Sequence, residues 1–178
     1  AYRREIGCQV TGTDLSGPCK RHAKDSYGIE VVLSSAYDLP EQFAAGHFDF
    51  VSISHVLEHL YEPNTVIRGI SKVLKKDGWC YIEVPDLECI QSAYQLPFDY
   101  FTFEHVNYFS KRSIRQLLEA NGFEIGILKT EKNEDQTAPY FPVIVCLAQK
   151  SAGKVSGAYV FSNSDRLSVQ SYISKCSE

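Results

Sequence analysis

Two histidines and a glutamate lie close together in the segment HVLEH, formed by His55, Glu58 and His59. Imidazole and carboxylate groups can transfer protons to and from a reacting molecule, and both can bind a metal ion. The segment directly follows residues 48–54, whose apolar pattern predicts a strand. Open α/β sheets bind their ligands beyond the carboxyl ends of the strands. The sequence therefore places these side chains where a ligand site is expected.

The same residues form the pattern H-x-x-E-H, which is also a zinc signature of one class of metalloproteases. In that class His55 and His59 must share one face of a continuous helix to bind the same ion. Here His55 comes directly off a strand, and Pro63 limits any helix to a short segment. A third ligand would have to come from elsewhere in the chain. We assign no metal ligand from the sequence, and a zinc hydrolase stays as an alternative.

Two further groups of residues could take part in chemistry. Glu104 and His105 are neighbours in FEHVNYFS, with Tyr108 close by, and a carboxylate beside an imidazole can act as a general base or a proton relay. Asp14 follows a predicted strand at residues 9–13. A carboxylate at that point can accept hydrogen bonds from the diol of a ribose. It can equally cap the next helix, and both interpretations stay open.

Strand-like and helix-like segments alternate along the chain, which predicts an α/β fold with parallel strands. The last two strands have no helix between them and can pair in antiparallel fashion. The predicted strands are residues 9–13, 29–33, 48–54, 79–84, 123–129 and 142–148, and the predicted helices are residues 16–27, 64–77, 110–121 and 165–175.

Composition narrows the class of protein. The 178 residues fit one ordinary domain, and the net charge of −4 argues against a nucleic-acid partner. No apolar run is long enough to cross a membrane, so we expect no membrane partner. The six cysteines are scattered without metal-ligand spacing, which favours reduced thiols and a cytoplasmic location. The oligomeric state is not predicted.

Several motifs in order resemble the class I S-adenosylmethionine-dependent methyltransferases. They are TGTDLS, SSAYDLP, FDFVSISHVLEHLYEP and LKKDGWCYIEVP. The block FEHVNYFS, followed by a helix and LLEANGF, resembles the branch that contains sugar C-methyltransferases and related small-molecule methyltransferases. The resemblance covers residues 1–150 and implies a Rossmann-like, doubly wound, mostly parallel sheet with a C-terminal antiparallel hairpin. Residues 151–178 are expected to be a tail or the start of a further region.

The resemblance also implies a role for each candidate residue. S-adenosylmethionine is the implied cofactor. The implied methyl acceptor is a small molecule, with a sugar or a sugar nucleotide as examples. Cofactor contacts are implied for Asp14 at the ribose, Leu15 at the adenine, Ser35 and Ala36 at the adenine edge, and Ser54 and His55 at the methionine part. Catalysis is implied for His105 as the base with Glu104 beside it, and substrate contact for His59 and Tyr108.

One feature of the family is absent from this sequence. No glycine-rich loop of the type D/E-x-G-x-G-x-G precedes the strand that ends at Asp14. The hypothesis is that the chain is truncated before or within that loop and lacks the first central strand. The strands that end at Asp14 and Ser54 would then each have an unpaired edge. A catalytically inactive α/β module that acts in binding or assembly is therefore the alternative to an active enzyme.

Overall fold

The computed structural model describes residues 7–89, 101–131, 142–151 and 163–176. The strands are β1 (Thr11–Asp14), β2 (Glu30–Leu33), β3 (Phe48–Ser54), β4 (Leu74–Pro85), β5 (Phe123–Glu131) and β6 (Val143–Lys150). The α-helices are α2 (Gly17–Tyr27), α3 (Leu39–Gln42), α4 (Pro63–Val73), α6 (Lys111–Glu119) and α7 (Asn163–Cys176). Three short 3₁₀ helices are η1 (Ala36–Asp38), η2 (Leu57–His59) and η3 (Leu87–Cys89).

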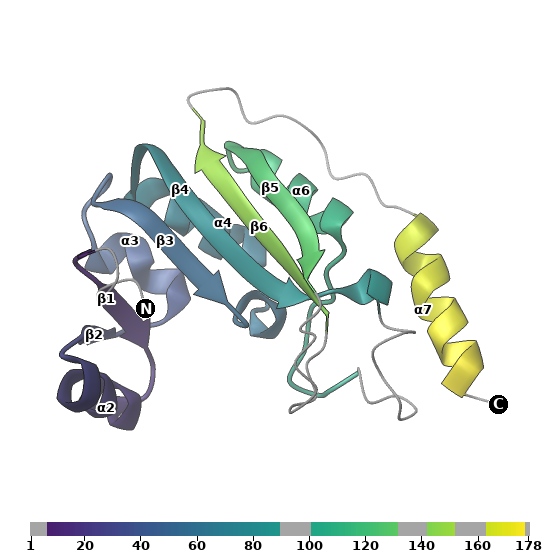
Figure 1. Ribbon diagram of the computed structural model, residues 1–178, viewed down its shortest axis with the longest axis horizontal. Coiled ribbons are helices and arrows are strands. Elements are labelled where there is room, and N and C mark those ends of the chain that lie inside the picture. Colours follow the sequence, from purple (N-terminus) through teal and green to yellow (C-terminus); the bar gives the residue numbers. More distant parts are fainter. Residues whose placement is uncertain (1–6, 90–100, 132–141, 152–162, 177–178) are drawn as a thin grey trace.

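The described strands form two separate sheets (Figure 1). In the smaller sheet β1 pairs with β2 in parallel, and in the larger one the order is β3-β4-β6-β5. The β3–β4 pair is parallel, whereas β6 runs antiparallel to both β4 and β5. Among the described residues, β1 and β3 each have a single partner. The predicted α/β class with its C-terminal antiparallel hairpin is confirmed, and no described strand lies between β1 and β3.

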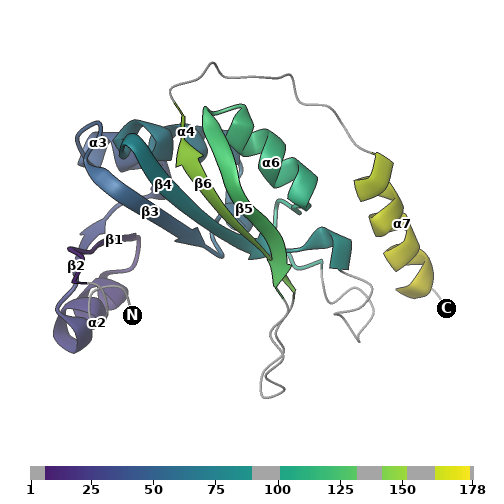
Figure 2. The ribbon, with the colours of Figure 1, turned by 45° about the horizontal axis from the view of Figure 1, so that its top comes forward.

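Helices α3, α4 and α6 cover one face of the larger sheet (Figures 1 and 2). The apolar stripe of α4 is buried completely at Val66, Ile67, Ile70 and Val73, since these positions recur at helical spacing. Burying such side chains supplies most of the stability of an amphipathic helix. The opposite face of the sheet is more open, because Phe50 and Ile127 there are 41% and 47% exposed.

The boundaries of two helices can be compared with those that the sequence predicts. The predicted helix at residues 64–77 is α4, which begins at Pro63 and ends at Val73. Leu74 continues the apolar stripe but has an extended backbone (ψ 140°), and it opens β4 instead. Helix α6 begins as predicted, because the Ser110 hydroxyl accepts from the backbone N–H of Ser113 while the Ser113 hydroxyl accepts from that of Ser110.

The C-terminal helix α7 packs beside η3 rather than lying free in solution. Tyr172 is 2% exposed and forms a small apolar cluster with Leu87, Phe101 and Tyr108. Its ring centroid lies 5.6 Å from that of Phe101. The predicted helix at residues 165–175 therefore exists, and it contacts the segment that carries His105.

Two further predictions concern side chains and membrane contact. Cys80 and Cys146 are buried within strands and serve as small core residues, as predicted, and no disulfide joins any of the described cysteines. No helix in the described part of the chain combines the length and the apolar character that a membrane span requires.

Candidate active site

The turn after β3 has an unusual backbone. His55 follows the strand with a positive φ of 51°, a conformation that non-glycine residues rarely adopt. This conformation costs about 1–2 kcal/mol, so its neighbours must hold it in place. The His55 N–H donates to the carbonyl oxygen of Glu83 at 2.9 Å, which extends the β3–β4 ladder by one step. The chain then turns sharply into η2.

The 3₁₀ helix η2 directs two of its side chains inward. Leu57 is fully buried and Glu58 is only 1% exposed, although Glu58 is charged in water at neutral pH. A buried carboxylate needs partners, because transferring a charge out of water is costly. Glu58 Oε1 lies 3.3 Å from His55 Nδ1. Among the described residues, its second oxygen, Oε2, has no hydrogen-bond partner.

A distant segment of the chain is held against this turn. The backbone N–H groups of Val106 and Asn107 both donate to the carbonyl oxygen of Glu58, at 2.9 and 3.0 Å. The side-chain amide of Asn107 donates to the carbonyl oxygens of Leu60 and Leu57. These bonds fix the position of the residues just before Val106. They therefore bring His105 to the turn that carries Glu58.

The result is a group of four side chains, His55, Glu58, His59 and His105, which we call the histidine–glutamate cluster. The ring centroids of His59 and His105 are 4.9 Å apart. His59 Nε2 lies 4.0 Å from Glu58 Oε1, and a ligating atom from each of Glu58, His59 and His105 falls within 4.8 Å of the others. Imidazole and carboxylate groups thus converge at the carboxyl end of β3.

A second carboxylate extends the cluster toward β4. His55 Nε2 lies 3.1 Å from Glu83 Oε1, so His55 bridges Glu58 and Glu83. Glu83 is held in turn by the hydroxyls of Ser54 and Tyr81, which donate to its two oxygens at 3.1 and 2.5 Å. Ser54 and His55, both predicted as cofactor contacts, are therefore joined through Glu83. Sequence reasoning missed Glu83 as a member of this site.

The pKa of His105 favours its neutral form. Partial burial lowers this pKa below its usual value, and the negative charge of Glu58 opposes that shift without reversing it. A neutral imidazole can accept a proton or offer a lone pair. Partial burial also raises the pKa of Tyr108, so its phenol stays protonated.

Three of the four predicted catalytic and substrate residues have side chains that lie close together, and the fourth does not. His59, His105 and Tyr108 come together, since the rings of His105 and Tyr108 lie 6.2 Å apart. Glu104 contacts this group through its backbone rather than through its carboxylate. Its side chain is exposed, and its backbone carbonyl accepts from His59 Nδ1 at 2.9 Å. The buried carboxylate of the cluster is that of Glu58, which the motifs assigned neither to catalysis nor to substrate binding.

Asp14 and Leu15, which the sequence predicts as cofactor contacts, lie at the end of the first strand of the smaller sheet. Ser16, rather than Asp14, is the N-cap of α2, because its hydroxyl accepts from the N–H of Cys19 at 3.3 Å. Asp14 Oδ1 accepts from the N–H of Ser16 at 2.7 Å, and the carboxylate remains exposed at the end of β1. Leu15 beside it is 78% exposed, an apolar surface that an adenine could cover.

The remaining predicted pair lies at the end of β2. The Ser35 hydroxyl accepts from the N–H of Tyr37, so Ser35 caps η1. Ala36 opens that turn and packs partly on the core. Asp14, Leu15, Ser35 and Ala36 thus end neighbouring parallel strands, which fits an adenosine group at this edge.

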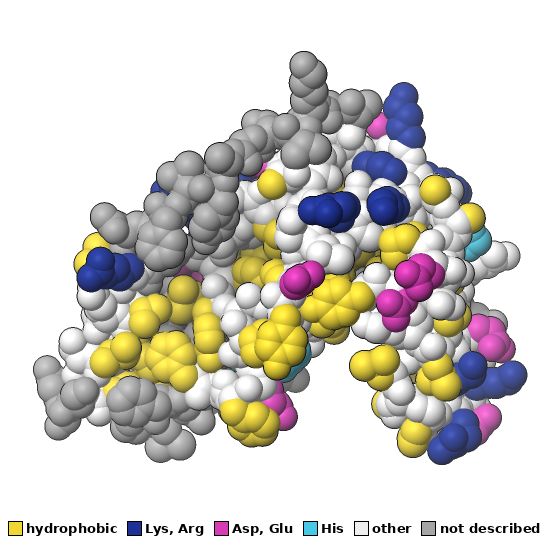
Figure 3. Space-filling view, turned by 180° about the vertical axis from the view of Figure 1, so that it is seen from behind, with side chains coloured by type: hydrophobic (Ala, Val, Ile, Leu, Met, Phe, Trp, Pro, Cys, Tyr) yellow, Lys and Arg dark blue, Asp and Glu magenta, His cyan; other side chains and the backbone are white. Residues whose placement is uncertain are grey.

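Figure 3 shows the molecule from behind, hollowed between the lobe of β1, β2 and α2 and the larger sheet. Hydrophobic side chains lie on both sides of this hollow. Asp14 and Leu15, predicted to contact adenosine, lie at the end of β1 in the lobe, whereas Ser54, His55 and the rest of the histidine–glutamate cluster belong to the larger sheet. A ligand that contacts both groups must therefore cross from one sheet to the other.

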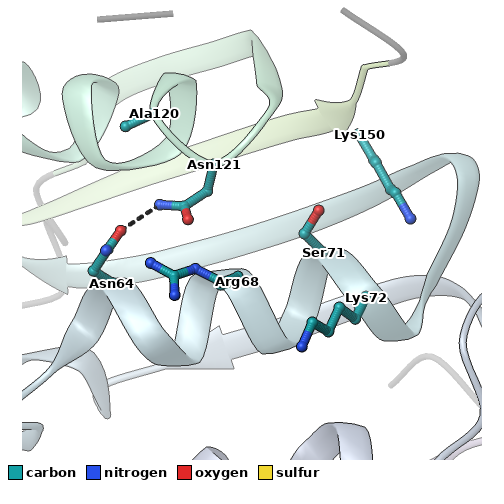
Figure 4. A pocket seen from close by; sticks show the side chains of 7 residues that line it. All are labelled: Asn64, Arg68, Ser71, Lys72, Ala120, Asn121 and Lys150. Carbon is teal, nitrogen blue, oxygen red and sulfur yellow. Dashed lines mark hydrogen bonds between the residues drawn. The ribbon is translucent and has the colours of Figure 1, made fainter. Parts of the chain in front are cut away.

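A separate pocket of about 490 Å³ lies along α4 (Figure 4). It is lined by Asn64, Arg68, Ser71, Lys72, Ala120, Asn121 and Lys150. The Asn121 amide donates to Asn64 Oδ1 at 2.7 Å across it. None of the residues predicted for the cofactor, catalysis or substrate lines this pocket. It therefore forms no part of the candidate active site.

Residues 1–126 match the family described as "Methyltransferase domain". The chain belongs to this methyltransferase family. The match spans the two sheets up to the start of β5, so it includes the strand ends and the histidine–glutamate cluster. It confirms the resemblance to class I S-adenosylmethionine-dependent methyltransferases that the ordered motifs indicated.

Curated relatives are methyltransferases named for different activities. A ubiquinone biosynthesis O-methyltransferase from Bordetella avium is 33% identical over 82 residues, which cover 43% of this chain and 34% of that protein. The C-methyltransferase NovU from Streptomyces niveus is 28% identical over 125 residues, which cover 68% of this chain and 29% of NovU. The chain thus spans about a third of the length of these relatives.

Solved structures confirm the fold. An S-adenosylmethionine-dependent methyltransferase from Methanosarcina mazei superposes with a TM-score of 0.64 at 20% identity, covering 80% of this chain and 82% of that one. A Burkholderia thailandensis 1,6-didemethyltoxoflavin-N1-methyltransferase, solved with S-adenosylhomocysteine, gives a TM-score of 0.63 at 18% identity, covering 84% and 64%. The Rossmann-like class I architecture is therefore shared with them.

Proposed function

We propose that this domain transfers a methyl group from S-adenosylmethionine to a small-molecule acceptor, of which a sugar or sugar nucleotide is one candidate. The single observation that supports this most is the histidine–glutamate cluster at the carboxyl end of β3, in a chain of the methyltransferase family. Nucleic acid is not a proposed partner, because the chain is acidic.

The residues at the strand ends fit the adenosine half of the cofactor. Asp14 would hold the ribose diol through its exposed carboxylate, Leu15 would cover the adenine, and Ser35 would face the adenine edge. When bound, S-adenosylmethionine supplies an electrophilic methyl group on a positively charged sulfur. Ser54 and His55 both contact the Glu83 carboxylate. Its negative charge would stabilise the positively charged sulfur of a cofactor bound beside Ser54 and His55.

His105 is the residue that we propose as the proton acceptor. A methyl group moves to carbon or oxygen most readily when the acceptor has lost a proton, and a neutral imidazole can remove it. His105 is half-buried, with a pKa that burial lowers, so it stays neutral near pH 7. His59 and Tyr108 flank it and would contact the acceptor. Glu104 stays a proposed member of the site, although its side chain faces solvent.

The names of the relatives support a small-molecule acceptor, but they differ in the atom that is methylated. NovU is named a C-methyltransferase, the ubiquinone relatives are O-methyltransferases, and the toxoflavin relative is named for a nitrogen. Free thiols at all six cysteines fit the cytoplasmic location that we propose for the protein.

The test separates cofactor binding from catalysis. Calorimetry with S-adenosylmethionine should give one site per chain, and transfer of a labelled methyl group to a panel of small acceptors should then be measured. His105→Ala should lower turnover about 100-fold or more while leaving cofactor affinity nearly unchanged. His22→Ala, an exposed histidine on α2, is the matched control and should change neither quantity. Absence of cofactor binding at millimolar concentration would instead indicate the inactive binding module.

A further inference from the structure

We infer that Glu58, His59 and His105 form a binding site for one divalent transition-metal ion, with Zn²⁺ as the best match to their donor atoms. Nothing in the methyltransferase assignment requires this site. It rests on the position of three side chains and on one carboxylate oxygen that lacks a partner among the described residues.

The unpartnered oxygen is the first observation. Glu58 is 1% exposed, and its Oε2 is buried without a hydrogen bond from any described residue. Leaving a buried carboxylate oxygen unsatisfied is costly, because the oxygen has lost its hydration without gaining a partner. Native structures therefore rarely keep one without a reason, and a role in binding an ion is one such reason. The neighbouring groups show that a cation would fit.

The hydrogen bond of His59 is the second observation. His59 Nδ1 lies 2.9 Å from the carbonyl oxygen of Glu104, and a carbonyl can only accept, so Nδ1 carries the proton. In the neutral ring, Nε2 then carries a lone pair, and this nitrogen lies 4.0 Å from Glu58 Oε1. Histidines that bind metals are oriented in this way, with the other nitrogen donating to a carbonyl or carboxylate.

The spacing of the three ligand atoms is the third observation. They lie within 4.8 Å of one another. Atoms bound to one tetrahedral ion at about 2.1 Å lie about 3.4 Å apart, so small side-chain rotations would close the site. His59 and His105 are both partly exposed and can make those rotations. The backbone bonds from Val106 and Asn107 to Glu58 already hold the two segments together.

The donor set selects the type of ion. Two imidazoles and one carboxylate suit Zn²⁺ and similar transition metals, whereas Mg²⁺ and Ca²⁺ prefer oxygen ligands. This set leaves at least one coordination position open in a tetrahedral ion. The geometry also differs from that of the metalloprotease signature, because His55 and His59 do not share a continuous helix. His105, from a separate segment, replaces His55 as the third ligand.

An ion at this site would bear on the proposed function, and this step rests on that function. Its open coordination position could take an oxygen of the methyl acceptor, and a bound ion would lower the pKa of such an oxygen. The ion would occupy one nitrogen of His105. The acceptor's hydroxyl would then lose its proton to solvent water because the ion lowers its pKa, and His105 would act as a ligand of the ion rather than as the base.

The experiment measures metal binding and needs no methyl transfer. The full chain is stripped with a chelator and titrated with Zn²⁺ by calorimetry, and Co²⁺ is titrated separately while the absorption spectrum is recorded. We expect one ion per chain with micromolar or tighter affinity. His59→Ala and His105→Ala should each weaken binding about tenfold or more, and Glu58→Gln should act similarly while keeping the buried shape of the side chain. His22→Ala should bind like the parent chain.

Three results would overturn the site. They are no saturable binding at millimolar Zn²⁺, equal affinity in the parent and in both histidine variants, or a Co²⁺ spectrum with the strong charge-transfer band of thiolate ligands. The last result would place the ion on exposed cysteines such as Cys8 or Cys19. Circular dichroism of each variant checks that it is folded. Failure of cofactor binding would leave these outcomes unchanged, so the two proposals fail independently.

Discussion

The backbone N–H of Asn107 donates to the carbonyl oxygen of Glu58 at 3.0 Å, and the Asn107 side chain donates to the carbonyl oxygens of Leu57, the first residue of η2, and Leu60, which follows it. One residue thus joins the segment that carries His105 to the turn that carries Glu58 and His59. The candidate active site depends on this contact, because the two segments are far apart in the sequence.

Asn107→Ala should loosen this connection. It leaves the carbonyl oxygens of Leu57 and Leu60 without their side-chain donor, and such losses cost about 1–3 kcal/mol of unfolding free energy. Denaturant unfolding measures the change. Asn64→Ala removes a comparable amide on the surface, where it bonds Asn121, and should change stability by less than about 0.5 kcal/mol. Equal effects of the two substitutions would contradict the role given to Asn107.

The positive φ of His55 gives a second prediction. His55→Val should lower the unfolding free energy by about 1–3 kcal/mol more than His55→Asn, because a β-branched residue resists the left-handed conformation and asparagine tolerates it. Both substitutions remove the contacts with Glu58 and Glu83, so their difference isolates the backbone. Thermal or denaturant melts of the pair test this. Indistinguishable stabilities would show that the turn relaxes at no cost.

The exposed carboxylate of Asp14 gives a prediction about the cofactor. Asp14→Asn should weaken S-adenosylmethionine binding about tenfold or more, because charge-assisted bonds to the ribose contribute about 1.5–3 kcal/mol. The asparagine side-chain oxygen can still accept from the N–H of Ser16, so the local turn is preserved. Asp25→Asn, on the surface of α2, is the matched control. Unchanged affinity in the Asp14 variant would remove this residue from the cofactor site.

A glycine in β5 gives a prediction about packing. A Cβ on Gly126 would lie 2.9 Å from the ring carbon Cζ3 of Trp79 and 3.3 Å from the carbonyl oxygen of Leu147. Gly126→Ala should therefore cost about 1–3 kcal/mol of stability, since the indole must move. At Gly17, in the first turn of α2, a methyl group would have its nearest neighbouring atom 3.7 Å away. Gly17→Ala should be neutral or slightly stabilising, and the same denaturation experiment compares the two.

Local elements could be predicted from the sequence because their signals are local. The stripe of Val66, Ile67 and Ile70 identified α4, and Ser110 marked the start of α6. The end of α4 was placed too late. Leu74 is buried whether it closes a helix or opens a strand, so apolar periodicity does not distinguish the two cases.

The site was only partly predictable for a different reason. The motifs identified His59 and His105 separately, but the contacts that join them involve main-chain carbonyls of Leu57, Glu58 and Leu60. Every residue has a main-chain carbonyl, so the pattern of side chains does not predict which carbonyl will accept a hydrogen bond. Asn107 offered a weak signal, as a side-chain amide between the aromatic residues of FEHVNYFS. Glu58 belongs to a motif that binds zinc when it lies on a continuous helix. In this structure the motif spans the end of β3 and the short helix η2, so that helix is not formed.

Because no described strand joins β1 to β3, the lobe of β1, β2 and α2 can melt without breaking a ladder of the larger sheet. Just beyond β2, the Tyr37 hydroxyl accepts a hydrogen bond from the Glu62 N–H, beside the packing of η1 on α4. We therefore expect the described chain to unfold as two cooperative units. A ligand that contacts Asp14 and His55 together would merge them, so that the protein would unfold in one transition rather than two.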